Sequence, residues 1–269
     1  MSGRAVPSSG HPGGSNEQEI ARLARSDRTS WWIRGRRALV TAVLQRRLGR
    51  AAEGTVGDLG CGAGGMFGAL GRFGDVVGID VSPLAVAVCR SKGYRGLAIG
   101  TLEQLPLRRE SLQLAGMTDV LEHVEDDEQV IRECLRVMKP GGVLLITVPA
   151  LRWLYGDHDR ALGHFRRYTG DEMRGLFVRC GFQVERITHF NTLLLPLALV
   201  SRALSMLRHE AKPRADPLDC ANPWNWLAYQ ALLAEEALIR MFDLPVGLSL
   251  LCVVRKPGRG DEASGALAP

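Results

Sequence analysis

The sequence predicts a doubly wound α/β fold, and three observations support this. Short runs of β-branched and other apolar residues alternate with segments of helical periodicity along most of the chain. The runs at residues 75–80 and 143–148 have apolar interiors, as expected when helices cover both faces of a parallel sheet. A glycine-rich loop at residues 60–65 joins the first run to a helical segment, which is typical of the first turn in such a sheet.

The chain begins with a segment rich in Gly, Ser and Pro, residues 1–16, which we expect to be a flexible tail. Residues 17–28 and 30–50 have helical periodicity and predict an N-terminal helical cover, residues 17–50. The cover belongs to one domain, predicted to span residues 17–256. Residues 257–269 are expected to form a second flexible tail.

The predicted sheet has seven strands, at residues 55–59, 75–80, 95–99, 112–118, 143–148, 183–189 and 248–255. Helices are expected at residues 66–73, 83–92, 126–138 and 171–180. Ser82 and Pro83 supply an N-cap and a first-turn proline for the second of these helices. Gly181 ends the last one.

A helical insertion, residues 191–247, separates the last two strands. Two apolar helical segments, residues 192–207 and 224–243, flank a linker at residues 209–223. In the second segment Glu236, Arg240 and Asp243 share one face and leave a wide apolar face. Three uses remain open: a lid over a ligand pocket, a homodimer contact, or peripheral contact with a membrane surface.

Charge is distributed unevenly along the chain. The net charge is +5, but the first 50 residues hold ten arginines against three acids, so the other 219 residues carry a net −2. A nucleic-acid-binding domain would be more uniformly basic, so we expect no nucleic-acid partner. The basic segment has three interpretations: a solvated helix face, a clamp in which Arg36 contacts a ligand carboxylate, or attraction of an anionic substrate or membrane.

The six cysteines include no CxxC pair and no Cys/His cluster, which argues against a disulfide framework and against a zinc knuckle. The N-terminus lacks the apolar core of a signal peptide, and the longest apolar runs are shorter than the ~18 residues that a membrane span needs. We therefore expect a cytoplasmic protein without a transmembrane segment.

The loop at Gly60, Cys61 and Gly62 predicts a nucleotide site, because glycines let main-chain N–H groups approach a ligand at a helix N-terminus. Asp58 precedes the loop, and Asp80 ends the next strand, where an acid accepts ribose hydroxyls. A dinucleotide is the main rival ligand. An acid beside the loop would repel a pyrophosphate, whereas it suits the ammonium group of an amino-acid-bearing nucleotide.

The run Asp58-Leu59-Gly60-Cys61-Gly62-Ala63-Gly64 resembles the loop motif of class I S-adenosylmethionine-dependent methyltransferases. The resemblance implies a Rossmann-like mixed sheet with the last strand antiparallel. It also implies S-adenosyl-L-methionine as cofactor and S-adenosyl-L-homocysteine as product. Further cofactor contacts are implied at residues that end or follow the second, third and fourth strands, namely Asp80, Val81, Thr101, Leu102, Glu103 and Asp119.

One residue departs from the family pattern. Thr101 stands where the family usually has an Asp that binds the adenine amino group. Adenine recognition is therefore expected to depend on the Thr101 hydroxyl, the Leu102 backbone or Glu103. This departure is the only feature that favours the alternative function, an S-adenosylmethionine-binding protein that transfers no methyl group.

Three segments show a narrower resemblance, to a bacterial methyltransferase subfamily associated with glycan, lipid-carrier and natural-product gene clusters. They are Trp31-Trp32 with the arginines that follow, residues 158–169, and residues 244–249. This resemblance implies methyl transfer to an O or N atom of a small-molecule acceptor, anionic or apolar, in specialised or envelope metabolism. RNA or protein methylation is a weaker alternative, because the fourth strand is not followed by the motif typical of base methylation.

Candidate catalytic residues lie after the fourth and fifth strands, because a hydroxyl acceptor usually needs a base. His123 follows the fourth strand at the edge of the sheet where doubly wound folds bind ligands. The alternative is that Glu122 and His123 only cap or orient this loop. We expect no metal site, since Asp119, Glu122 and His123 lie close together in the sequence and no distant carboxylate is identified.

After the fifth strand, His158, His164 and Tyr168 form a second group of candidates. Asp157 and Asp159 flank His158 and are expected to hold it as a general base, unless His158 has a purely structural role. Arg166 and Arg167 follow in the same segment. They are interpreted either as a site for an anionic acceptor group or as solvated charges.

Overall fold

The computed structural model describes residues 17–49, 54–208 and 223–261. The first predicted tail, residues 1–16, lies wholly outside the described residues. Most of the predicted linker, residues 209–222, and most of the second predicted tail, residues 262–269, also lie outside them.

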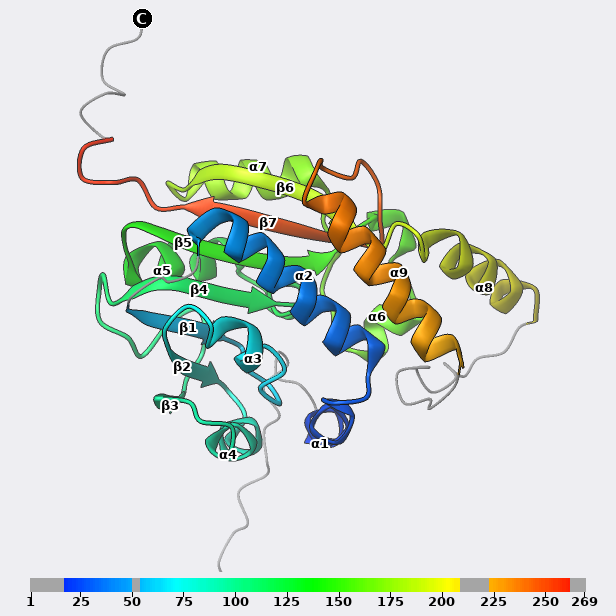
Figure 1. Ribbon diagram of the computed structural model, residues 1–269, viewed down its shortest axis with the longest axis horizontal. Helices are drawn as coiled ribbons and strands as arrows, with labels where there is room; N and C mark the ends of the chain where they lie inside the picture. The colour runs from blue at the N-terminus through cyan, green and yellow to red at the C-terminus, as the bar shows by residue number, and fades with distance from the viewer. Residues whose placement is uncertain (1–16, 50–53, 209–222, 262–269) are drawn as a thin grey trace, which may run out of the picture.

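Seven strands form one mixed sheet in the order β3-β2-β1-β4-β5-β7-β6 (Figure 1). Their bounds are β1 (Thr55–Leu59), β2 (Asp75–Asp80), β3 (Gly96–Ile99), β4 (Leu112–Thr118), β5 (Met138–Pro149), β6 (Gln183–Phe190) and β7 (Ser249–Arg255). The first five strands pair in parallel, and β7 lies antiparallel to both β5 and β6. The predicted mixed sheet with an antiparallel last strand is confirmed.

Nine helices and two 3-10 turns connect the strands within the described residues. The helices are α1 (Glu17–Ser26), α2 (Trp31–Leu48), α3 (Phe67–Leu70), α4 (Pro83–Arg90), α5 (Asp127–Val137), α6 (Asp157–Ala161), α7 (Gly170–Arg179), α8 (Leu195–Arg208) and α9 (Pro223–Ile239), and the turns are η1 (Leu121–His123) and η2 (Arg152–Leu154). The Ser82 side chain caps α4 as predicted, by accepting a hydrogen bond from the Ala85 amide. Helix α3 is shorter than predicted, because Gly65, Gly68 and Gly71 lower the helix propensity of this segment.

Helices cover both faces of the sheet, which explains the apolar interior of β5. Val143 and Leu145 pack in the core formed with α2, α3 and α9, whereas Leu144 and Ile146 pack in the core formed with α5 and α7. Figure 1 shows α2 and α9 crossing one face of the sheet side by side, with α5 and α7 on the other face. Successive side chains of a strand point to opposite faces, so a strand between two helical layers is apolar throughout.

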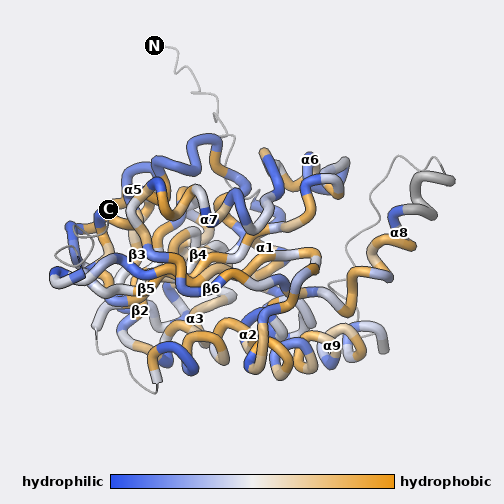
Figure 2. Tube along the Cα trace, turned by 90° about the horizontal axis from the view of Figure 1, so that it is seen from above, coloured by the Kyte–Doolittle hydropathy of each residue, from blue (hydrophilic) through white to orange (hydrophobic). Residues whose placement is uncertain are grey.

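Helix α8 projects from the rest of the molecule (Figure 2). Its Arg202 guanidinium donates hydrogen bonds to the carbonyls of Leu154 and Tyr155, at 2.7 and 3.3 Å. This contact joins the insertion to the segment that follows β5. Among the described residues, no helix has the length and apolar character that crossing a membrane requires.

Helices α2 and α9 pack closely at Gly35, where a side chain would clash with Leu232. A Cβ atom added at Gly35 would lie 2.3 Å from Cδ1 of Leu232. We expect Gly35→Ala to lower the free energy of unfolding, because overpacking costs about 1–3 kcal/mol. This exceeds the gain in helix propensity, which is at most about 1 kcal/mol. Urea unfolding measures the difference.

Gly175 in α7 is the matched control for Gly35. A Cβ atom at Gly175 would meet only Nη1 of Arg179, at 3.1 Å, and that flexible end can move. Gly175→Ala should therefore leave the stability unchanged or raise it slightly. Equal stability of the Gly35→Ala variant and the wild type would show that the α2–α9 contact tolerates a methyl group.

Candidate functional site

The glycine-rich loop lies between the carboxyl end of β1 and α3. The amides of Gly60 and Cys61 both donate to the Ile79 carbonyl of β2, at 2.8 and 3.0 Å. Gly60, Gly62 and Gly64 have φ values of 72°, 48° and 71°, in the left-handed region that favours glycine. A Cβ atom at Gly62 would meet no atom of the described residues within 4 Å, so the backbone at this position is open to a ligand.

Asp80 ties the loop to the adjacent turn. Its Oδ2 accepts a hydrogen bond from the Gly62 amide at 2.8 Å, and its Oδ1 accepts one from the Ser82 amide at 2.9 Å. A carboxylate oxygen has two lone pairs, so each oxygen can still accept a ligand hydroxyl. Val81 follows Asp80 and is half-buried. The predicted ribose-binding acid is thus positioned beside the exposed loop backbone.

Asp58 lies in β1 beneath the loop, buried from solvent. Burial raises the pKa of its carboxyl to about 6, against the opposing effect of a hydrogen bond that the Tyr94 hydroxyl donates. Cys61 lies beside it, with its Sγ 3.7 Å from that of Cys89. Tyr94 is a site residue that the sequence analysis missed, because no motif marks a tyrosine between α4 and β3.

The segment predicted to contact adenine is anchored to α5. Leu102 is buried, whereas Thr101 and Glu103 are half-buried. The Gln129 side chain donates to the Glu103 carbonyl at 3.0 Å, and Glu133 accepts from the Leu105 amide at 2.8 Å. These bonds fix the backbone of the segment, while the side chains of Thr101 and Glu103 remain partly accessible.

Asp119 follows β4 in the left-handed conformation, with φ of 54°, which is uncommon for a residue other than glycine. Its Oδ1 accepts a hydrogen bond from the Thr147 hydroxyl at 2.8 Å, and its Oδ2 pairs with the guanidinium of Arg36. Arg36 also lies 5.3 Å from the centroid of the Trp32 ring. The guanidinium of Arg36 therefore has a carboxylate partner within the protein. This ion pair joins α2 to the carboxyl edge of the sheet.

Trp31 and Trp32, which the resemblance also singles out, hold the start of α2. Trp32 stacks on Phe190 with ring centroids 5.9 Å apart, and the Trp31 amide donates to the Asn225 side chain at 2.9 Å. Both rings are half-buried against the core. Asn225 belongs to α9, so the insertion and the N-terminal cover support each other.

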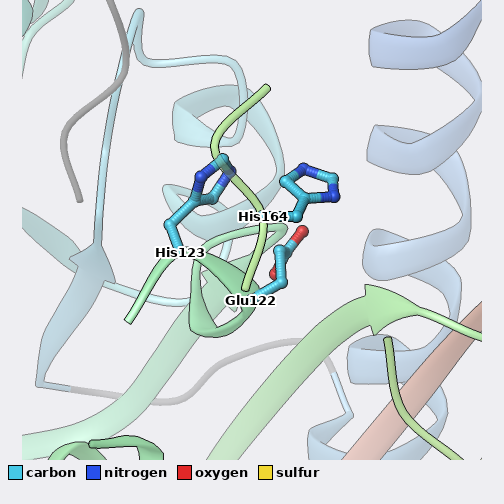
Figure 3. A group of neighbouring side chains, drawn as sticks. All are labelled: Glu122, His123 and His164. Carbon is cyan, nitrogen blue, oxygen red and sulfur yellow. The ribbon is translucent and has the colours of Figure 1, made fainter. Parts of the chain in front are cut away.

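His123 and His164 meet at the same edge of the sheet, together with Glu122 (Figure 3). The two imidazole rings are in edge-to-face contact, with centroids 4.6 Å apart. Burial, reinforced by His164, lowers the pKa of His123 to about 4, so its imidazole is neutral at pH 7. Burial and the nearby Asp119 raise the pKa of Glu122 well above its usual range.

Asp159 holds His164 rather than His158. Its Oδ1 lies 3.1 Å from Nδ1 of His164 and accepts a hydrogen bond from Arg167 at 2.8 Å. Burial would raise the pKa of Asp159, but these two bonds outweigh it and lower the pKa to about 2. His158 is exposed, and Asp157 pairs with Arg160. Successive helix residues point about 100° apart, so Asp159 faces inward while His158 faces solvent.

Tyr168, the fourth predicted catalytic residue, points into the core. Its side chain is 4% exposed, and its hydroxyl lies 3.1 Å from Oδ2 of Asp127. Arg166 also donates to Asp127, at 3.0 Å, and Arg167 donates to the Ala150 carbonyl at 3.2 Å. These three side chains therefore anchor the segment after β5 through contacts within the protein.

Other arginines of the N-terminal cover line a separate hollow of about 420 Å³ between α2, α3 and α9. Arg34 contacts the Tyr229 ring there, 4.0 Å from its centroid. Arg37, Arg72 and Arg240 also line the hollow. None of the residues predicted to contact the cofactor lies in its wall.

The low pKa of His123 predicts a pH dependence of stability. As the pH falls from 6.5 towards 4, the unfolded state binds a proton at this residue and the folded state does not, so the folded protein loses stability. The loss is roughly 2–3 kcal/mol, since each pKa unit corresponds to about 1.4 kcal/mol. His123→Gln should lose correspondingly less stability over this range.

His158→Gln provides the control for this measurement, because this exposed histidine lies outside the contact between His123 and His164. Thermal or urea unfolding at several pH values gives the comparison. Parallel curves for His123→Gln and the wild type between pH 4 and 6.5 would contradict the low pKa.

Three comparisons place this geometry among known proteins. Residues 57–146 match a family described as "Methyltransferase domain". A probable S-adenosylmethionine-dependent methyltransferase of Mycolicibacterium smegmatis is 32% identical over 176 residues, which is 63% of this chain and 65% of that protein. A ubiquinone biosynthesis O-methyltransferase of Pseudomonas paraeruginosa is 33% identical over 111 residues, 39% of this chain and 47% of that protein.

Among solved structures, a putative methyltransferase in complex with the Haloferax volcanii Trm112 methyltransferase activator superposes with a TM-score of 0.59. The identity is 19%, and the match covers 90% of this chain and 98% of that one, so it concerns the fold. The chain spans less than two thirds of the length of the two curated relatives described above.

Proposed function

The chain belongs to the class I S-adenosylmethionine-dependent methyltransferases through residues 57–146, and from this premise we propose that it transfers a methyl group from S-adenosylmethionine to a small-molecule acceptor. One observation supports the proposal most strongly. The glycine loop, which Asp80 holds through the Gly62 amide, lies at the same edge of the sheet as the contacting pair His123 and His164. A donor site and a pair of proton acceptors are thus adjacent to the same strand ends.

The residues of the loop fit the methyl donor. Gly62 presents open backbone, and Asp80 keeps lone pairs free for the two ribose hydroxyls. Asp58, directly below, is a carboxyl group suited to the donor's ammonium. When bound, S-adenosylmethionine would supply an electrophilic methyl carbon, which the acceptor's nucleophilic atom attacks in line as the bond to sulfur breaks and S-adenosylhomocysteine leaves.

His123 and His164 supply the acceptor side of the proposed reaction. A hydroxyl acceptor loses its proton as it is methylated, and a neutral imidazole can accept that proton. His123 is neutral above a pH of about 4. Asp159 orients His164 through Nδ1, which leaves Nε2 of that ring as the nitrogen able to receive the proton.

The proposed acceptor is a small molecule methylated at O or N, in bacterial specialised or envelope metabolism. The relative named as a ubiquinone biosynthesis O-methyltransferase supports methylation at an oxygen. Apolar side chains that remain exposed near the segment after β5, at Trp153 and, in α8, at Leu197 and Val200, support an apolar acceptor. Because Arg202 joins α8 to this segment, the insertion would form one wall of the acceptor pocket.

Two measurements test the proposal. S-adenosylmethionine and S-adenosylhomocysteine should each raise the melting temperature, and a panel of hydroxyl and amine acceptors should include one that yields S-adenosylhomocysteine. No stabilisation by either compound would overturn the proposal. Stabilisation without turnover of any acceptor would favour a protein that binds the donor but transfers no methyl group.

A further inference from the structure

Three side chains from two separate segments converge beside the strand ends (Figure 3). Glu122 and His123 belong to η1, after β4, whereas His164 belongs to the segment after β5. One carboxylate oxygen of Glu122 and one ring nitrogen of each histidine all lie within 4.8 Å of one another. His164 is thus the distant ligand-type residue that the sequence did not identify.

Glu122 gives an independent indication that a ligand is bound here. Its side chain is buried, at 1% exposure, and its Oε2 has no hydrogen-bond partner among the described residues. A buried carboxylate oxygen without a partner is costly and calls for a cation or a donor. Arg36 and Arg167 form their ion pairs with Asp119 and Asp159, although the Nε of Arg36 is also buried without a hydrogen-bond partner among the described residues.

His164 is held in the manner of a metal-binding histidine. Its Nδ1 contacts Asp159, a carboxylate with no exposed surface, and Arg167 fixes that carboxylate in turn. A carboxylate bonded to one ring nitrogen sets the tautomer and orients the other nitrogen towards a metal ion. The supporting residues of such a site are therefore present in the protein as it stands.

We propose that Glu122, His123 and His164 bind one divalent transition-metal ion. Two imidazoles and one carboxylate suit Zn²⁺, Fe²⁺ or Co²⁺. Metal–ligand distances of about 2.0–2.2 Å place ligand atoms roughly 3.0–3.6 Å apart, so small rotations from the present geometry suffice.

Three protein ligands leave a coordination position open. If the proposed methyl transfer is correct, an acceptor hydroxyl bound at that position would lose its proton more readily, because a metal ion lowers the pKa of a bound hydroxyl. In the metal-bound form His123 and His164 would be ligands and not proton acceptors, so the proton would pass to solvent. This role of the metal ion in activating an acceptor rests on the proposed function, whereas metal binding itself does not depend on it.

Titration calorimetry with Zn²⁺ at pH 7 tests the site on the whole chain. The wild type should bind one equivalent, and His164→Gln and Glu122→Gln should each weaken binding at least about tenfold, since even supporting residues of such sites matter to this extent. His158→Gln is the matched control, an exposed histidine in the same segment that should bind like the wild type. Circular dichroism confirms that each variant is folded.

The absorption spectrum of bound Co²⁺ distinguishes binding at this site from binding at the buried thiols Cys61 and Cys89. The proposal expects visible bands without a thiolate charge-transfer band, and the same spectrum for Cys89→Ser. Absence of binding in the wild type, unchanged binding by folded His164→Gln, or loss of binding in Cys89→Ser would each overturn it. Because no methyl acceptor is used, these outcomes are independent of whether the chain transfers methyl groups.

Discussion

Replacing Asp80 with alanine is expected to weaken the binding of S-adenosylmethionine about 100-fold or more. Asp80 has two roles in this prediction. Its oxygens accept hydrogen bonds from the amides of Gly62 and Ser82, and their remaining lone pairs can accept the ribose hydroxyls. A hydrogen bond to a charged group contributes about 1.5–3 kcal/mol, and about 2.7 kcal/mol corresponds to a 100-fold change in affinity. Titration calorimetry with S-adenosylmethionine measures the effect directly.

Asp75 at the other end of the same strand is the matched control. It is exposed, and its nearest ion-pair distance is 3.8 Å, to Nε of Arg95. Asp75→Ala removes the same charge from β2 but leaves the loop intact, so its donor affinity should equal that of the wild type. A less than threefold loss in Asp80→Ala, with the fold intact, would mean that the loop binds the donor without this carboxylate.

Replacing Gly60 with alanine is expected to destabilise the fold by about 2–5 kcal/mol. The left-handed conformation costs an alanine about 1–2 kcal/mol, and the new Cβ would lie 2.6 Å from Cγ2 of Val120. Overpacking of this kind adds about 1–3 kcal/mol. Since small domains have only about 5–15 kcal/mol of stability, the loss is large and should be evident in urea unfolding.

Gly62 in the same loop separates conformation from packing. It also has a positive φ, 48°, but a Cβ atom there would meet nothing within 4 Å. Gly62→Ala should therefore cost only about 1–2 kcal/mol, for the left-handed conformation. Its donor affinity should fall nevertheless, because the methyl group would occupy the open approach to the loop. Equal stability losses in the two variants would show that Val120 does not limit the space at Gly60.

Much of the fold was predictable because its signals are local. The bounds of β1, β2 and β4 agree with the predicted residues, since each strand is a short apolar run that ends at a glycine or a polar residue. The Ser82 cap and the Pro83 start of α4 followed from local chemistry. The shortened α3 shows the limit of such reasoning, because apolar periodicity alone overlooks the glycines within it.

The site was predictable only in part. Asp80 and the loop glycines could be predicted because a tight turn and an acid at a strand end depend on neighbours along the chain. The position of His164 against His123 could not, because 41 residues separate them and only the packing of the segment after β5 brings them together. Tyr94, which bonds to Asp58, carries no local signal at all.

The sequence by itself determined the succession of strands and helices along the chain, the glycine loop and the match of residues 57–146 to a methyltransferase domain, because each is encoded within short windows of residues. Only the tertiary structure decided which partner each charged side chain has. Arg36 contacts Asp119 rather than solvent, Asp159 faces His164 rather than His158, and Glu122 is buried with one oxygen that has no partner among the described residues. The physical reason is that burial depends on how a helix or loop is rotated against the sheet. That rotation is set by packing across the whole domain and not by the neighbouring residues.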